Sequence, residues 1–194
     1  IKSLIPKNVN LKFRQLMYIT KYIFHKILGW KIEGDFDKSI KKSVVIVAPH
    51  TTNYDFIVCS FTRRILKTQI NFVGKKALFA WPIGWYFRWM GGEPLERAKS
   101  ENKVEAIKKV FDGLDEFRLA LAPEGTRKQV EKWKTGYYYI ALSAKVPIIP
   151  VSLDYPSKTI CIGKEFYPTG DIEKDELELH EFFKGKTGKF PKGF

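Results

Sequence analysis

The chain of 194 residues has little cysteine, no long apolar run and, over its first 32 residues, no acidic side chain. Its two cysteines, Cys59 and Cys161, form no C-x-x-C pair, which excludes a disulfide scaffold and a cysteine-built zinc site and fits a reducing compartment. Because no 18 apolar residues follow one another, the sequence predicts no transmembrane span. Apolar residues still make up 44% of the chain, which is enough to build the core of one compact domain.

The charge of the chain is strongly basic and unevenly placed. The net charge is +13, and seven basic residues precede the first acidic one, Glu33. Across this stretch the apolar residues fall on one arc at helical spacing, which predicts a basic amphipathic helix that ends at Gly29. Such a helix suits an anionic bilayer surface, and it equally fits a surface helix that docks on the core. We expect residues 1–32 to be a basic helical appendage and residues 33–194 to be the main domain.

From residue 43 onward, short apolar runs alternate with helical stretches, among them an aromatic helix that has Pro82 near its start. The pattern predicts strands at residues 44–48, 70–73, 118–122 and 148–153, and helices at residues 53–66, 81–90, 100–114, 135–144 and 171–183. Two short strand-like pieces follow residue 158, and residues 185–194 are expected to form a loose tail. The fold class predicted is α/β, with a mixed, largely parallel sheet flanked by helices and an N-terminal amphipathic helix.

His50 is the histidine best placed for chemistry, because it follows a buried strand at the edge where open α/β sheets form their crevices. If Thr52 or Asn53 begins the next helix, Asp55 lies in its first turn and can reach back to the imidazole. A carboxylate on Nδ1 leaves Nε2 free as a general base for a substrate hydroxyl. A strand-end histidine with a structural partner, or half of a metal site, would give the same spacing.

Three further segments have polar or glycine-rich turns next to apolar strands. Residues 119–127 form an apolar run that leads into Glu124, Gly125, Thr126 and Arg127, where the glycine permits close approach of a ligand and the arginine can hold a phosphate. A Glu–Arg ion pair that closes a loop is the structural alternative. Residues 91–97 form a glycine-rich turn that ends in Arg97, and residues 146–151 form a short strand bounded by two prolines.

Together these four blocks closely resemble the glycerolipid acyltransferase superfamily, typified by the 1-acyl-glycerol-3-phosphate acyltransferases, over residues 43–155. The H-x4-D, glycine-to-arginine, E-G-T-R and V-P-I-I-P-V segments occur in the family's order, and Lys134 and Gly136 match a pattern downstream of E-G-T-R. The resemblance implies that His50 is the general base and that Asp55 orients it. It also implies acceptor, phosphate or acyl-donor binding by a further set of residues: Arg97, Glu124, Gly125, Thr126, Arg127 and Pro150.

The expected reaction moves a fatty acyl group from acyl-CoA or acyl carrier protein to a hydroxyl of a lysophospholipid, without a metal or redox cofactor. The resemblance implies a peripheral protein on the cytoplasmic face of the cell membrane, in contact with its anionic surface. The chain departs from the family at Glu93, where a hydrophobic residue is usual, and at residues 75–78, where Lys-Lys-Ala-Leu lacks the family's glutamate. A lyso-aminolipid such as lyso-ornithine lipid is therefore an alternative acceptor.

Two readings outside the enzyme class also follow from the composition. The net charge and the aromatic content fit a nucleic-acid-binding domain, but the basic residues gather at the two ends and no nucleic-acid-binding motif is apparent, so no nucleic acid is expected as a partner. A catalytically inactive lipid-binding protein of the same fold is disfavoured by the intact pair of His50 and Asp55. The aromatic residues 79–89 fit an acyl-chain groove, the core or a surface that faces a membrane.

Overall fold

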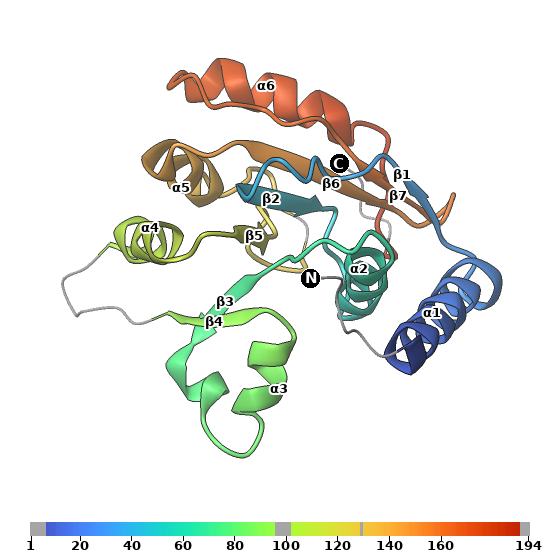
Figure 1. Ribbon diagram of the computed structural model, residues 1–194. Helices are drawn as coiled ribbons and strands as arrows, with labels where there is room; N and C mark the ends of the chain where they lie inside the picture. The colour runs from blue at the N-terminus through green and yellow to red at the C-terminus, as the bar shows by residue number, and fades with distance from the viewer. Residues whose placement is uncertain (1–6, 96–101, 129, 191–194) are drawn as a thin grey trace.

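A computed structural model describes residues 7–95, 102–128 and 130–190. Its centre is a five-stranded sheet in the order β1-β7-β6-β2-β5, with helices on both sides (Figure 1). The strands are β1 (Lys31–Glu33), β2 (Lys42–Ala48), β5 (Phe117–Leu121), β6 (Ile148–Asp154) and β7 (Thr159–Ile162). Neighbours pair in parallel except β6 and β7, which are antiparallel. The predicted α/β class with a mixed, largely parallel sheet is confirmed.

β2 lies inside the sheet, between β6 and β5, where its mostly apolar residues are buried on both faces. Val44 and Ile46 pack in one core layer with apolar side chains of three helices, α4 (Lys103–Gly113), α5 (Gly136–Ala144) and α6 (Ile172–Phe183). Val45 packs on the opposite face with the second layer, which includes Val58 of α2 (Tyr54–Ile65). The sheet therefore has a core on each side, and the carboxyl ends of β2 and β5 lie side by side.

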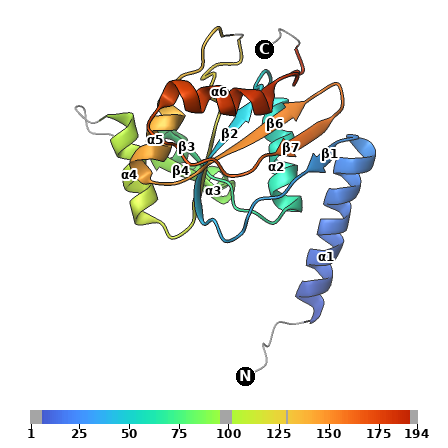
Figure 2. The same ribbon diagram turned by 90° about the horizontal axis from the view of Figure 1, so that it is seen from above.

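The N-terminal helix α1 (Lys7–Tyr22) continues into a π-helical turn (Ile23–Ile27), and Gly29 ends it with a φ of +74°. Met17 and Phe24 are buried, whereas other apolar side chains remain exposed: Leu11, Leu16, Tyr18, Ile19, Tyr22 and Ile27. Figure 2 shows α1 projecting from the rest of the molecule. The helix thus docks on the core along one edge and leaves much apolar surface open. Within the described ranges, no helix has the length and apolar character needed to cross a membrane.

A small lobe beside the main sheet differs from the sequence prediction. β3 (Phe72–Lys75) pairs in parallel with β4 (Gly92–Leu95), where the sequence predicted only a glycine-rich turn. Between them lie a 3-10 turn (Lys76–Phe79) and helix α3 (Gly84–Trp89). The predicted helix over residues 81–90 is too long, and Pro82 lies in the turn before α3. Gly84 begins α3 because its missing Cβ lets the chain pass directly over the carbonyl of Phe79.

The C-terminal region is more ordered than predicted. After β7, Phe166 forms a single bridge to Ile148, and Asp171 caps α6 by accepting a hydrogen bond from the Lys174 N–H at 3.2 Å. The predicted loose tail is wrong for residues 185–190, because their backbone is hydrogen-bonded to the body of the protein. The Thr187 N–H donates to Asp154 Oδ1 at the end of β6, at 3.1 Å, and its carbonyl accepts the Tyr155 N–H at 2.9 Å. The Lys189 N–H donates to Thr51 Oγ1 at 3.0 Å. The remainder of that prediction, residues 191–194, lies outside the described residues.

Candidate active site

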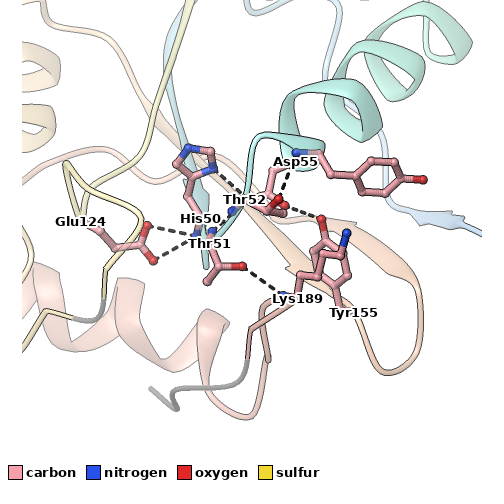
Figure 3. Close-up of polar contacts among 8 residues, drawn as sticks. His50, Thr51, Thr52, Asp55, Glu124, Tyr155 and Lys189 are labelled. Atoms are coloured by element: carbon pink, nitrogen blue, oxygen red, sulfur yellow. Dashed lines mark hydrogen bonds and ion pairs between the residues drawn. The ribbon is translucent and has the colours of Figure 1, made fainter.

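His50 and Asp55 lie together at the carboxyl end of β2 (Figure 3). The strand ends at Ala48, the chain turns, and α2 begins at Tyr54, which places Asp55 in the first turn of the helix. His50 Nδ1 lies 2.9 Å from Asp55 Oδ2. Because a carboxylate only accepts hydrogen bonds, Nδ1 carries the hydrogen and Nε2 is the basic nitrogen. About a quarter of the His50 side chain is exposed, so the imidazole is open to a substrate.

Asp55 is almost completely buried, and its carboxylate is saturated with donors. Oδ2 accepts the backbone N–H groups of Thr51 at 2.9 Å and Thr52 at 3.0 Å, in addition to the imidazole. Burial raises the pKa of Asp55, but hydrogen bonds from His50, Tyr155 and the Thr52 N–H outweigh it, so that the pKa lies below its ordinary value. Asp55 is therefore ionised and fixed in position. Asn53 begins the helix without a side-chain cap, while Thr52 Oγ1 accepts from the Tyr54 N–H at 3.2 Å.

Tyr155 is a member of this network that the sequence analysis missed. Its hydroxyl donates to Asp55 Oδ1, and its ring packs edge-on against the buried Trp30, with ring centres 4.9 Å apart. Burial and the bond to Asp55 raise the pKa of Tyr155, so its hydroxyl keeps its proton and remains a donor. Tyr155 directly follows β6, and its position after an apolar strand was the one available signal, the same signal that singled out His50.

Glu124 follows β5 and is buried against the backbone of His50. Both carboxylate oxygens accept the His50 N–H, at 3.1 and 3.0 Å. Burial raises the pKa of Glu124 to about 7, although the His50 N–H partly offsets that effect. The carboxylate thus holds the loop that carries the imidazole.

The rest of the E-G-T-R segment forms a turn beside the imidazole loop. Gly125 has a φ of +63°, a conformation that favours glycine, and the Lys134 side chain lies across it, so that a Cβ there would come within 2.7 Å of Lys134 Cδ. Thr126 Oγ1 accepts from the Lys128 N–H at 3.3 Å, and the side chain of Arg127 is exposed. The turn therefore offers an exposed guanidinium and an adjacent ammonium to an anionic ligand.

The other two predicted site residues have different outcomes. Arg97 lies outside the described residues. Pro150 lies within β6, so the prediction that two prolines bound this strand is wrong. It pairs with Ile46 of β2, and on the β7 side its carbonyl accepts the Gly163 N–H at 2.8 Å. Its ring packs where a Cβ of Gly163 would otherwise lie.

A cavity of about 280 Å³ opens beside the imidazole, between the sheet and α2. His50 and Asp55 form its polar wall, and the rest is mainly apolar: Val45, Val47, Phe56, Phe72, Leu121 and Val151 among others. Cys59 also lines it, and burial raises the pKa of Cys59 to about 12, which keeps the thiol neutral. The guanidinium of Arg63 on the same wall is bonded to the carbonyls of Ile70 and Met90, at 2.8 and 2.5 Å. The cavity is suited to an alkyl chain.

Metal ligands are not grouped in this part of the protein. In the described ranges, no three histidine, cysteine, aspartate or glutamate side chains are arranged to hold a metal ion.

Comparisons with known proteins agree with the motifs. Residues 14–154 match the family model described as Acyltransferase. The chain is 30% identical over 146 residues to a 1-acyl-sn-glycerol-3-phosphate acyltransferase of Escherichia coli, covering 71% of this chain and 58% of that protein. A yeast (Saccharomyces cerevisiae) protein of the same name is 26% identical, with 69% and 45% coverage. The chain thus spans about half the length of these relatives.

A solved structure shows the same fold. The crystal structure of the 1-acyl-sn-glycerophosphate (LPA) acyltransferase PlsC from Thermotoga maritima superposes with a TM-score of 0.57. It is 20% identical to this chain, and the match covers 96% of this chain and 86% of that one.

Proposed function

The chain belongs to the acyltransferase family, and from that membership we propose that it transfers a fatty acyl group from a thioester to a hydroxyl of a lysophospholipid. The first candidate acceptor is 1-acyl-glycerol-3-phosphate, the substrate named for the bacterial and yeast relatives. The donor is acyl-CoA or acyl carrier protein. The observation that carries the proposal is the contact of 2.9 Å between His50 Nδ1 and a buried, ionised Asp55.

In the proposed reaction, His50 is the general base. Nε2 takes the proton of the acceptor hydroxyl while its oxygen attacks the thioester carbonyl, forming a tetrahedral oxyanion. Collapse of this intermediate breaks the carbon–sulfur bond, and the imidazolium returns the proton to the departing thiolate. Asp55 keeps Nδ1–H oriented and stabilises the imidazolium, and Glu124 positions the same loop through the His50 backbone.

The cavity beside His50 supports the proposal that the substrate carries an acyl chain. It is mainly apolar, is lined in part by His50, and is bounded by side chains of the sheet and α2. Burying each methylene group of an acyl chain there contributes about 0.8 kcal/mol to binding. Because His50 lines the cavity, an acyl chain bound in it would hold the thioester carbonyl or the acceptor close to the imidazole. Pro150 is the further residue proposed for the donor, on the family pattern alone.

The acceptor phosphate is proposed to bind at the turn that follows β5. Gly125 and Thr126 shape this turn and Arg127 projects from it, with Lys134 lying alongside. Arg97 completes the proposed set on the basis of its motif. No metal or redox cofactor takes part in this mechanism.

We also propose that the protein works as a peripheral protein at the cytoplasmic face of the cell membrane. The exposed apolar face of α1 and its basic residues support contact with an anionic bilayer. Residues 1–32 then serve as the lipid-facing appendage and residues 33–194 as the acyltransferase domain.

The experiment that tests the function is a panel of lyso-acceptors with labelled acyl-CoA and labelled acyl carrier protein, in the presence of membranes. We expect transfer to 1-acyl-glycerol-3-phosphate with one donor, and loss of that transfer in His50→Ala. Transfer to lyso-ornithine lipid alone would assign the alternative acceptor. No transfer to any acceptor by the wild-type protein would contradict the proposal.

A further inference from the structure

The net charge of the chain is confined to two segments. Residues 1–32 and 56–92 hold 13 basic side chains and no acidic one, while the rest of the chain holds 21 of each sign. The first segment contains α1, and the second runs from α2 through β3 and α3 to the start of β4. In Figure 1, α1 and α3 lie below the main sheet, and α6, with five acidic residues among its twelve, lies above it. One side of the molecule is therefore basic.

The same side exposes an unusual set of tryptophans. Trp81 is 92% exposed, Trp85 69% and Trp89 65%, and they follow one another at intervals of four residues through the turn and α3. Ile83, Tyr86 and Leu78 are also exposed. The other two tryptophans, Trp30 and Trp133, are buried in the two core layers. Contiguous exposed apolar surface of this kind marks a binding site.

The lobe that carries these side chains has a core of its own. Phe87 packs edge-on against Phe72 and Phe79, with ring centres 6.5 and 6.3 Å apart. Arg88 lies over the Phe79 ring and donates to the Phe79 carbonyl at 2.9 Å, and the Gly84 N–H donates to Ala80 at 2.8 Å. The inward aromatic side chains therefore hold the outward ones on a folded support, so their exposure is a property of the fold.

An apolar groove joins this lobe to the N-terminal helix. It has a volume of about 900 Å³ and is lined from three helices, by Leu16 and Ile19 of α1, Phe56 and Ile57 of α2, and Tyr86 and Trp89 of α3. Four of its lining residues also line the cavity beside His50: Phe56, Ser60, Arg63 and Met90. The groove thus adjoins the proposed acyl-chain cavity.

We propose that the tryptophan turn, residues 78–89, is a second lipid-contacting element that inserts into the interface of an anionic bilayer. Tryptophan and tyrosine rings favour the headgroup level of a membrane, and basic side chains around them attract anionic lipid. Contact at both α1 and α3 would lay the groove between them on the bilayer, so that lipid substrates reach the cavity without crossing water. This inference extends the proposed membrane association, and its main test does not depend on acyl transfer.

The test compares wild-type protein with the variant Trp81→Ser/Trp85→Ser/Trp89→Ser in sedimentation with vesicles of equimolar phosphatidylglycerol and phosphatidylcholine. A matched control, Tyr139→Ser/Tyr167→Ser/Leu177→Ser, removes exposed apolar side chains from other parts of the surface. We expect vesicle affinity to fall at least about tenfold in the tryptophan variant and to stay unchanged in the control, because interfacial binding scales with the apolar area buried.

Fluorescence quenching by lipids with brominated acyl chains gives a second measurement. Emission of the wild-type protein should be quenched on vesicles, whereas the triple variant keeps only Trp30 and Trp133 and should be unaffected. Equal vesicle affinity of the two proteins together with no quenching would overturn the proposal. A dimeric wild-type protein together with a monomeric triple variant in solution would also overturn it, because the surface would then be an interface between copies.

The enzymatic arm separates this inference from the proposed function. Transfer to a water-soluble short-chain acceptor should be the same in the wild-type protein and the tryptophan variant, while transfer to a vesicle-borne acceptor should fall with vesicle affinity. If the wild-type protein binds vesicles through these tryptophans but transfers to neither acceptor, the lipid surface stands and the proposed function fails.

Discussion

The loop around His50 and the surface around Trp81 both reverse the usual burial of side chains, in opposite senses. In the loop, carboxylates are buried: Asp55 is 1% exposed and Glu124 6%. On the α3 lobe, Trp81 is 92% exposed. Burying a charge is costly unless donors surround it, and exposing a large aromatic ring leaves apolar area in water.

The two regions differ in where the compensation comes from. Asp55 receives four hydrogen bonds from its own chain, and Glu124 receives the His50 N–H on both oxygens. The loop around His50 is therefore held in place by hydrogen bonds within the chain. The tryptophans gain their compensation only when something apolar covers them. Variants of the first region should change turnover and leave vesicle affinity unchanged. The tryptophan variant should lose vesicle affinity and keep its turnover with a water-soluble acceptor.

The largest effect is expected for His50→Ala. Removing the proposed general base should lower turnover by about 10³-fold, because positioned acid–base catalysis typically contributes about 10²–10⁴-fold. Vesicle affinity should not change, since His50 is not one of the exposed apolar residues of the tryptophan turn. Single-turnover kinetics with labelled donor and sedimentation with vesicles measure the two quantities. Turnover like that of the wild-type protein would show that His50 is not the base.

A smaller effect is expected for Arg127→Ala, which removes an exposed guanidinium from the turn after β5. Loss of one or two charge-assisted hydrogen bonds to the acceptor phosphate should raise the acceptor KM about 10- to 100-fold with little change in kcat. Lys128→Ala, which removes the adjacent exposed charge, is the matched control and should be nearly silent. An unchanged KM with a collapsed kcat would contradict a binding role.

Tyr155→Phe tests the hydrogen bonding that fixes Asp55 in the first region. The hydroxyl binds Asp55, and the ring packs on Trp30, which follows the N-terminal helix. Because the Tyr155 bond helps to lower the pKa of Asp55, its loss should raise that pKa and make the carboxylate more basic. A more basic carboxylate stabilises the imidazolium more strongly, so the acid limb of kcat/KM should move to higher pH, with about a tenfold lower kcat. Tyr54→Phe, a neighbouring hydroxyl deletion, should not shift the limb. An unshifted limb in Tyr155→Phe would mean that the hydroxyl only fills space.

The sequence predicted the parts of the site that are local. His50 and Asp55 are five residues apart, and a strand followed at once by a helix brings them together, so spacing alone indicated their contact. Glu124 and Tyr155 reach the same loop across 74 and 100 residues. Their partners depend on the order of strands in the sheet, which a linear pattern does not contain. The motif placed Glu124 in the site but gave no reason to expect it on the His50 backbone.

The failures of fold prediction have similar causes. β4 contains Gly92 and Pro94, residues that weaken the signal of a strand, and it exists because β3 pairs with it. The tail beyond α6 is rich in lysine and glycine, so its composition indicated disorder. It is fixed by hydrogen bonds of the Thr187 and Lys189 backbone groups, which a pattern of side-chain types does not indicate.

The smallest effect is expected for Glu124→Gln and appears as a dependence of stability on pH. The pKa of Glu124 is raised from 4.5 to about 7, chiefly by burial, so between these values the folded protein holds a proton that the unfolded chain has released. Stability then falls as the pH rises through this window.

Glutamine can still accept the His50 N–H but does not titrate. Urea unfolding should show the wild-type protein losing stability relative to Glu124→Gln from about pH 4.5 to 7, with a constant difference at higher pH. Glu131→Gln, at an exposed position, should parallel the wild-type protein throughout. A difference that stays flat across the window would mean that the loop accommodates the Glu124 carboxylate as readily as water does, and the contrast with the exposed tryptophans would then rest on Asp55 alone.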